Sequence, residues 1–337
     1  MRKLTLLYVL IIGAYLIYAL NFFYEKGEQE QGAGATTGLA GSLEEKYVMV
    51  TFQSGIDYWK SVLKGFEDAA EAMNVSVEYR GSAKYDAHEQ MTVLEQVIAK
   101  KPAGIAISVM NPELLTPSID KAVEAGIPVV LFDAGAPNSK AYSTLATNNY
   151  NAGVVAARTM ANLIGGSGEV GVITLPNQLN HQERTNGFRD TLAQEFPDIR
   201  LVAVKDGKGD RIVSRDASTS IINAYPSVKG IFNTDAVGGV GVADAVRLAQ
   251  RQGIIEVIAF DTDKVTLDMV KDGEISATLA QGTWNMGYWS LQYLFHLHHG
   301  LTNPDSGQTA DASPLPVYVD TGISVVTNNN VDNYYVK

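Results

Sequence analysis

The feature that most constrains the fold of this chain is a repeated alternation between short apolar runs and longer amphipathic segments. Runs such as 104–108 (GIAIS) and 128–132 (PVVLF) are apolar along almost their whole length. Segments such as 58–72 instead carry apolar residues at helical spacing. Strands that are apolar throughout are buried on both faces, which is typical of parallel sheets covered by helices. The alternation therefore predicts an α/β fold built from βα units.

The number of these units predicts two lobes rather than one. The chain has 337 residues, of which 46% are hydrophobic, and single cores stop growing near ~250–300 residues. The alternation also restarts near residue 150, and the β-type runs of 317–337 are expected to close a hinge. We therefore predict two Rossmann-like βα lobes joined by that hinge. The first comprises 45–147 and about 282–310, and the second comprises 148–281 and about 311–337.

The N-terminal region predicts a membrane anchor followed by a linker. Residues 4–24 form an uncharged run of 21 residues, and a helix with ~1.5 Å rise per residue would span the ~30 Å hydrocarbon layer. The run ends in bulky residues, which favours an uncleaved anchor over the alternative of a cleaved signal peptide. Arg2 and Lys3 precede the run and Glu25 follows it, so the rest of the chain is expected outside the cytoplasm. Residues 25–44 are rich in Gly, Gln and Glu and are expected to form a flexible linker.

Composition excludes several classes of function. The chain carries 26 Lys and Arg against 37 Asp and Glu, a net charge of -11, and such an acidic chain is a poor partner for nucleic acid. It has no cysteine, so we expect no disulfide, no thiolate metal site, no cysteine nucleophile and no cysteine-linked lipid anchor. Neither His88 nor His181 lies in a recognisable catalytic triad. We therefore expect a binding protein that is not an enzyme and that needs no metal or other cofactor.

Polar and aromatic residues follow the expected strands, where open α/β sheets bind their ligands. Carboxylates accept hydrogen bonds, arginine donates them from a rigid fork, and aromatic rings can cover the apolar face of a sugar. A single aspartate after a strand is more often a helix N-cap than a ligand, so the inference depends on recurrence. A polyhydroxylated ligand is predicted from the residues at these ends: Tyr58, Trp59, Asp133, Arg184, Thr234, Asp235, Asp261, Gln281 and Trp284.

Taken in order, these segments resemble the type I periplasmic sugar-binding proteins of the ribose, xylose and galactose group. Effector domains of LacI-type repressors share that fold. The resemblance runs from about Tyr47 to about Val326. The segments that carry it include YWKSVLKGFEDAA at 58–70, GIPVVLFDAGAP at 126–137, QERTNGFRD at 182–190, IFNTD at 231–235 and DGEISATLAQ at 272–281.

The resemblance implies roles for the residues at the strand ends. Tyr58 and Trp59 match the aromatic pair that sandwiches the sugar, Asp133 the carboxylate of the first lobe, and Arg184 the guanidinium of the second. Ribose binders often have an arginine where this chain has Ala134, so the resemblance argues against ribose. Its segments FDAGAP at 132–137 and TNNY at 147–150 favour xylose or another neutral monosaccharide. The other family ligand positions fall on Thr234 or Asp235, Asp261 and Gln281.

The resemblance also implies that the ligand bridges both lobes and stabilises a closed state. Arg184 is expected to reach the ligand from the second lobe. We therefore expect Arg184→Ala to abolish sugar binding and to leave the fold intact, because a donor at a strand end adds little to the core.

Two membrane partners remain open. A permanent membrane helix suits a stoichiometric signalling complex, which favours a membrane histidine kinase that responds to lobe closure. The alternative is the substrate-binding component of a sugar ABC importer, with a permease as its partner. In either case we expect a single-pass protein of the cell membrane with its ectodomain outside, in a bacterium without an outer membrane.

Overall fold

The computed structural model describes residues 39–302 and 315–335. The predicted anchor at 4–24 lies outside the described residues, as does most of the predicted linker at 25–44. Within the described part of the chain, no helix has both the length and the apolar character needed to cross a membrane. The described residues from Leu43 onward form one compact unit.

This unit contains two six-stranded sheets of matching topology. The first has the order β11-β5-β4-β3-β1-β2 and the second β12-β10-β9-β8-β6-β7. Apart from the antiparallel pair β10–β12, all neighbouring strands are parallel. The strands of the first sheet are β1 (Lys46–Thr51), β2 (Ser76–Gly81), β3 (Gly104–Ile107), β4 (Val129–Phe132), β5 (Thr144–Ala146) and β11 (Tyr318–Asp320). Those of the second are β6 (Gly168–Thr174), β7 (Ile199–Asp206), β8 (Val228–Asn233), β9 (Glu256–Phe260), β10 (Ala277–Gln281) and β12 (Ile323–Val326).

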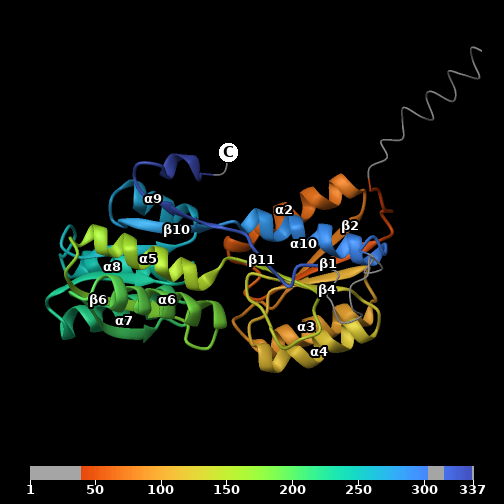
Figure 1. Cartoon of the computed structure of the whole chain (residues 1–337), viewed down its shortest axis with the longest axis horizontal. Coiled ribbons are helices and arrows are strands. Elements are labelled where there is room, and N and C mark those ends of the chain that lie inside the picture. The colour runs from red at the N-terminus through yellow and green to blue at the C-terminus, as the bar shows by residue number, and fades with distance from the viewer. Residues whose placement is uncertain (1–38, 303–314, 336–337) are drawn as a thin grey trace, which may run out of the picture. The chain divides into compact units, whose positions relative to one another are not determined.

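Helices cover both faces of each sheet, which confirms the predicted two-lobed α/β fold (Figure 1). In the first lobe, α2 (Tyr58–Met73) and α10 (Thr283–His298) pack on one face, and α3 (Ala87–Ala99) and α4 (Pro112–Glu124) on the other. In the second lobe, α5 (Asn149–Leu163) and α6 (Leu179–Glu195) lie opposite α7 (Arg211–Ala224), α8 (Gly238–Leu248) and α9 (Lys264–Lys271). A short 3₁₀ helix, η1 (Val331–Asn333), packs on the core with α7 to α9.

The alternation of side chains along a strand explains why the strands are apolar throughout. In β1, Tyr47 and Met49 pack in the core under α2 and α10, whereas Val48 and Val50 pack under α3 and α4. Successive residues of a strand point to opposite faces of its sheet. A strand between two helical layers therefore has to be apolar at every position.

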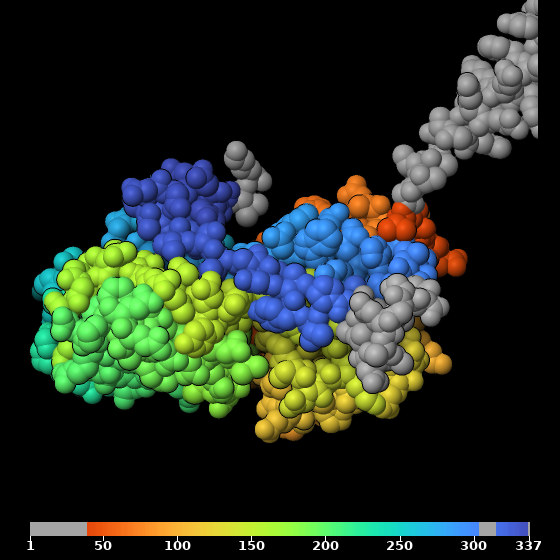
Figure 2. Space-filling view, in the orientation of Figure 1, coloured from red at the N-terminus to blue at the C-terminus, as the bar shows by residue number. Residues whose placement is uncertain are grey.

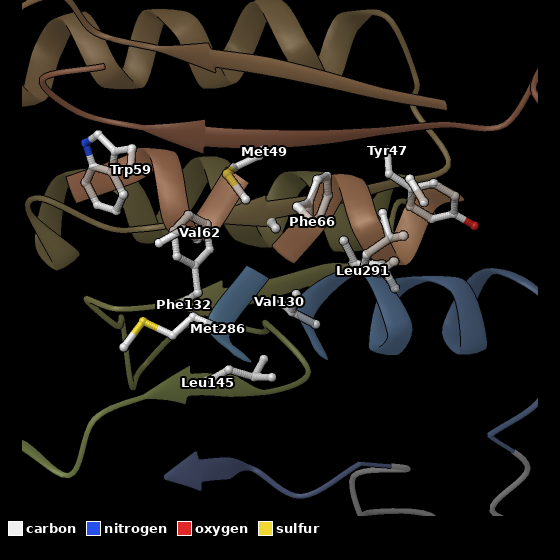
Figure 3. Packing of buried hydrophobic residues seen from close by; sticks show 14 of the residues in the cluster. Tyr47, Met49, Trp59, Val62, Phe66, Val130, Phe132, Leu145, Met286 and Leu291 are labelled. Atoms are coloured by element: carbon white, nitrogen blue, oxygen red, sulfur yellow. The ribbon is translucent and has the colours of Figure 1, made fainter. Parts of the chain in front are cut away.

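Glycines allow the helices of one layer to approach closely. A Cβ at Gly287 of α10 would lie 1.8 Å from the carbonyl oxygen of Val62 in α2, and one at Gly65 would lie 2.1 Å from the carbonyl oxygen of Trp284. Figure 3 shows Val62, Phe66, Met286 and Leu291 packed together in the core beneath this contact. Helices α5 and α6 also approach closely at a glycine, because a Cβ at Gly187 would lie 2.0 Å from the carbonyl oxygen of Tyr150.

The described chain passes between the lobes after β5, after β10 and after β11. These crossings are bonded to one another. The N–H of Thr321 donates to the carbonyl oxygen of Ala146 at 3.0 Å, and one carboxylate oxygen of Asp320 accepts from the N–H of Asn148 (3.0 Å) and of Gly322 (2.9 Å). The crossings therefore form a joint at which the two lobes can hinge.

The C-terminal segment corrects one predicted boundary. The region 311–337 was expected to belong to the second lobe, but β11 pairs with β5 in the first sheet and only β12 joins the second. Figure 2 shows residues 315–335, in blue, lying across the boundary between the two lobes. The three-residue strand β5 was not predicted at all, because a run this short carries too little periodicity.

Candidate functional site

A pocket lies at the carboxyl ends of the strands and is lined by residues of both lobes. Its empty volume, counted together with space that is open to solvent, is about 460 Å³. It brings together seven of the nine residues predicted from the strand ends: Tyr58, Trp59, Asp133, Arg184, Asp235, Asp261 and Gln281. These residues come from six separate segments of the chain, so only the folded topology assembles them.

Two pocket aspartates occupy equivalent positions in the two lobes. Asp133 directly follows β4, and Asp261 directly follows β9, the corresponding strand of the second sheet. Both have left-handed backbones, with φ of 60° and 70°, a conformation that aspartate tolerates better than most residues. The N–H of each is held by the neighbouring strand, at 3.1 Å from the oxygen of Leu145 and 2.8 Å from that of Leu279. The turn thus places each aspartate at the edge of its sheet that borders the pocket.

Hydrogen bonds within each lobe fix its carboxylate. The Tyr58 hydroxyl donates to Asp133 at 2.7 Å and the Ser108 hydroxyl at 2.9 Å. The Gln281 amide donates to Asp261 at 2.8 Å. Burial raises the pKa of both aspartates, and that of Asp261 reaches about 8 although Arg184 lowers it. Both sites therefore gain from donors that stabilise the charged form, such as sugar hydroxyls.

Arg184 is 2% exposed and is oriented by its neighbours. Its Nε donates to Asn149 Oδ1 (2.8 Å), Nη1 to the Thr234 carbonyl oxygen (2.7 Å) and Nη2 to Gln281 Oε1 (3.0 Å). Its guanidinium carbon also lies 3.8 Å from the centre of the Phe260 ring. A guanidinium has five N–H donors, so the two that these bonds leave over are available to a ligand in the pocket.

Tyr58 and Trp59 form the aromatic wall of the first lobe. Their ring centres lie 4.7 Å apart, and the Trp59 indole N–H donates to the Phe52 carbonyl oxygen at 2.8 Å. Trp284, the third aromatic residue considered for this wall, lies elsewhere. It is 39% exposed on α10, donates to Asp68 and stacks on Tyr288. The helical phase of α10 directs it away from the pocket.

Thr234 also departs from the prediction. It is fully buried and is not among the residues that line the pocket. Its carbonyl oxygen accepts from Arg184, and its hydroxyl lies 3.0 Å from His181 Nδ1. Thr234 therefore lies behind two pocket residues and does not itself line the pocket.

Asp235 combines the two roles considered for an aspartate after a strand. Its Oδ1 accepts from the N–H groups of Val237 (2.9 Å) and Gly238 (2.8 Å), at the start of α8. Its Oδ2 is buried and, within the described residues, has no hydrogen-bond partner. The same holds for the amide nitrogen of Gln178, another pocket residue. Buried polar atoms are rarely left unpaired, so the pocket has capacity for a polar ligand.

Several lining residues lay outside the predicted set, notably Gln53, Tyr85, Gln178, Asn180 and His181. Gln53 and Gln178 follow strands, so the rule that identified Asp133 also applies to them. Tyr85 lies four residues beyond β2, and His181 lies within the first turn of α6. No spacing in the sequence distinguishes those two from ordinary surface or core residues.

The raised pKa of Asp261 predicts a pH-dependent affinity. Sugar hydroxyls that donate to its carboxylate would lower the pKa in the complex, so binding near pH 7 should release up to about one proton. Affinity should therefore rise with pH by up to ~tenfold per unit and level off above about 8. Calorimetry in buffers of different ionisation enthalpy measures this proton. Asp261→Asn should release fewer protons on binding the sugar than the wild type does. Equal proton release by the two proteins would contradict the assignment to Asp261.

Comparison with known proteins agrees with this geometry. The family model for the periplasmic binding protein domain matches residues 47–301. A sugar-binding protein of a sugar ABC transporter from Bacillus halodurans is 66% identical, with 86% of this chain and 100% of that chain covered at a TM-score of 0.82. AraP, an arabinose-binding protein from Geobacillus stearothermophilus, is 63% identical over 87% of this chain and 99% of that chain, with a TM-score of 0.79. The xylose/arabinose-binding protein XylF of Sulfolobus acidocaldarius is 25% identical over 80% of this chain and 68% of its own length.

Proposed function

The chain belongs to the family of periplasmic sugar-binding proteins, and we propose that it is an extracytoplasmic receptor that closes on an aldopentose, with arabinose as the favoured ligand. The observation that supports this proposal is the set of residues that line the pocket. Two carboxylates, a guanidinium with two available donors and an aromatic wall converge there from both lobes. This set can pair hydroxyls that both donate and accept, and it can cover the C–H face of a ring.

The preference for arabinose comes from the comparisons. The 63% identical AraP is an arabinose-binding protein, whereas the sequence favoured a xylose-like sugar, which stays a prediction. Arabinose and xylose are both neutral aldopentoses and differ in the orientation of hydroxyl groups. The polar contacts of the pocket, more than its size, should therefore distinguish them.

Calorimetric titration with a panel of sugars tests this proposal. The panel contains both enantiomers of arabinose together with xylose, ribose, glucose and galactose. We expect one-to-one binding of an arabinose at micromolar concentration or tighter, with weaker binding of the other sugars. Tighter binding of xylose would restore the sequence-based preference, and no binding across the panel would contradict a monosaccharide receptor.

For the membrane partner we propose a histidine kinase. The support is the uncharged run at 4–24, which as an anchor would hold the receptor beside one membrane protein. An ABC permease is the second candidate, because the 66% identical relative is described as a component of a sugar ABC transporter. Both proposals place the sugar-binding unit outside the cell membrane.

Deletion of the receptor gene separates the two partners. With a kinase partner, arabinose-induced transcription should be lost, while uptake of radiolabelled arabinose through a constitutively expressed transporter should persist. Loss of that uptake with retained transcriptional induction would instead support the importer.

A further inference from the structure

Three threonine hydroxyls lie in a row behind His181. The Thr185 hydroxyl donates to the His181 carbonyl oxygen at 2.8 Å. The Thr234 hydroxyl donates to Thr174 Oγ1 at 3.1 Å, and Thr234 Oγ1 also lies 3.0 Å from His181 Nδ1. All four residues are at least nine-tenths buried, so water does not compete for these bonds.

The number of protons in this row determines which nitrogen of His181 carries hydrogen. A hydroxyl has one proton to donate. Thr185 uses its proton on the His181 carbonyl oxygen, and Thr174 Oγ1 lies 3.1 Å from the hydroxyl oxygens of both Thr185 and Thr234, so we take the Thr234 hydroxyl as the donor to Thr174. The Thr234 oxygen can then only accept from His181, so Nδ1 carries a hydrogen. Burial and the neighbouring Arg184 lower the pKa of His181 well below its usual value, which keeps the ring neutral. A neutral imidazole has one N–H, so Nε2 is a bare acceptor.

We propose that His181 Nε2 accepts a hydrogen bond from one hydroxyl of the bound sugar, and that Thr234 is a positioning residue that fixes this role. His181 lines the pocket and its Nδ1 is bonded to Thr234, so Nε2 is the ring nitrogen left to bond a ligand. The proposal rests on the proposed function, because it concerns the same pocket and its sugar.

This arrangement makes His181 a specificity determinant. Arg184 can only donate, whereas Nε2 in this tautomer can only accept. A sugar must therefore present a hydroxyl that donates at the position facing His181. An analogue without that donor leaves this nitrogen unpaired in the complex, which should cost roughly 10–100-fold in affinity.

The tautomer can be tested without any sugar. In protein labelled with ¹⁵N-histidine, long-range ¹H–¹⁵N correlation at pH 7 should show a protonated Nδ1 and an unprotonated Nε2 for His181. Thr234→Val, which has the same shape but no hydroxyl, should shift the ring toward the Nε2–H form, and Thr234→Ser should restore it. An Nε2–H tautomer in the wild type would overturn the proposal. A tautomer that stays unchanged in a folded Thr234→Val protein would overturn the role of Thr234.

The hydroxyl can be tested with deoxy and deoxyfluoro analogues of the sugar that binds best. Fluorine can accept weakly but cannot donate, so at one ring position both analogues should lose a similar 10–100-fold. His181→Ala should lose affinity for the parent sugar and show no further loss with those two analogues, as expected for coupled groups in a double-mutant cycle. Independent losses at every ring position would overturn the contact. If no sugar binds at all, the proposed function fails while the tautomer result stands.

Discussion

Arg184→Met should lose sugar binding by roughly 10²–10⁴-fold. Methionine is long enough to keep packing on Phe260, but it removes the two donors that the protein leaves available to a ligand. Each charge-assisted hydrogen bond contributes ~1.5–3 kcal/mol, and ~1.4 kcal/mol corresponds to tenfold in affinity. Calorimetric titration with arabinose measures the loss.

Arg158→Met is the matched control for this variant. Arg158 lies on α5 in the same lobe, but it is largely exposed and pairs with Glu195 on the surface. The affinity of Arg158→Met for arabinose should therefore stay within about threefold of the wild type. A folded Arg184→Met protein that binds as well as Arg158→Met would contradict the assigned site.

The contacts of Arg184 show that its substitution should also destabilise the fold, whereas the sequence led us to expect an intact fold. The side chain is buried, and its removal leaves acceptors on Asn149, Thr234 and Gln281 without their donor. Each buried acceptor left unpaired costs ~1–3 kcal/mol. We therefore expect a lower unfolding temperature for Arg184→Met, and binding should be compared well below that temperature.

Gly287→Ala should lower the free energy of unfolding by about 2–3 kcal/mol. The new Cβ would lie 1.8 Å from the Val62 carbonyl oxygen and 2.9 Å from the Phe66 nitrogen. These are backbone atoms of α2, so the two helices have to separate. The higher helix propensity of alanine offsets only ~1 kcal/mol of this cost. Because α2 begins at Tyr58, sugar affinity should fall as well.

Asn285→Ala provides the comparison on the same helix. Asn285 is exposed, two residues before Gly287, so the substitution adds no atom to the helix contact and should leave stability within ~0.5 kcal/mol of the wild type. Urea unfolding monitored by circular dichroism measures both variants. Coincident midpoints would show that the contact between α2 and α10 tolerates a methyl group.

Much of the site could be predicted because topology fixes its position. Asp133 and Asp261 follow strands, and the carboxyl ends of parallel strands meet at one edge of a sheet. The two-lobed fold followed in the same way from strands that are apolar on both faces. Neither inference requires the direction of an individual side chain.

What could not be predicted depends on side-chain direction. Thr234 and Asp235 are consecutive residues after β8, and only Asp235 reaches the pocket. Successive residues near a strand end point to opposite sides, so the sequence alone could not choose between them. His181 was discounted because it has no catalytic partner in the sequence. The buried hydroxyls that orient it come from β6, α6 and the loop after β8.

Solution X-ray scattering with and without arabinose tests the central claim most directly, namely that the two lobes close on a sugar held between them. We expect the radius of gyration of the purified protein to decrease when arabinose saturates it, and to stay constant in Arg184→Met under the same conditions. Calorimetric binding of arabinose with an unchanged radius of gyration would contradict a ligand that bridges both lobes.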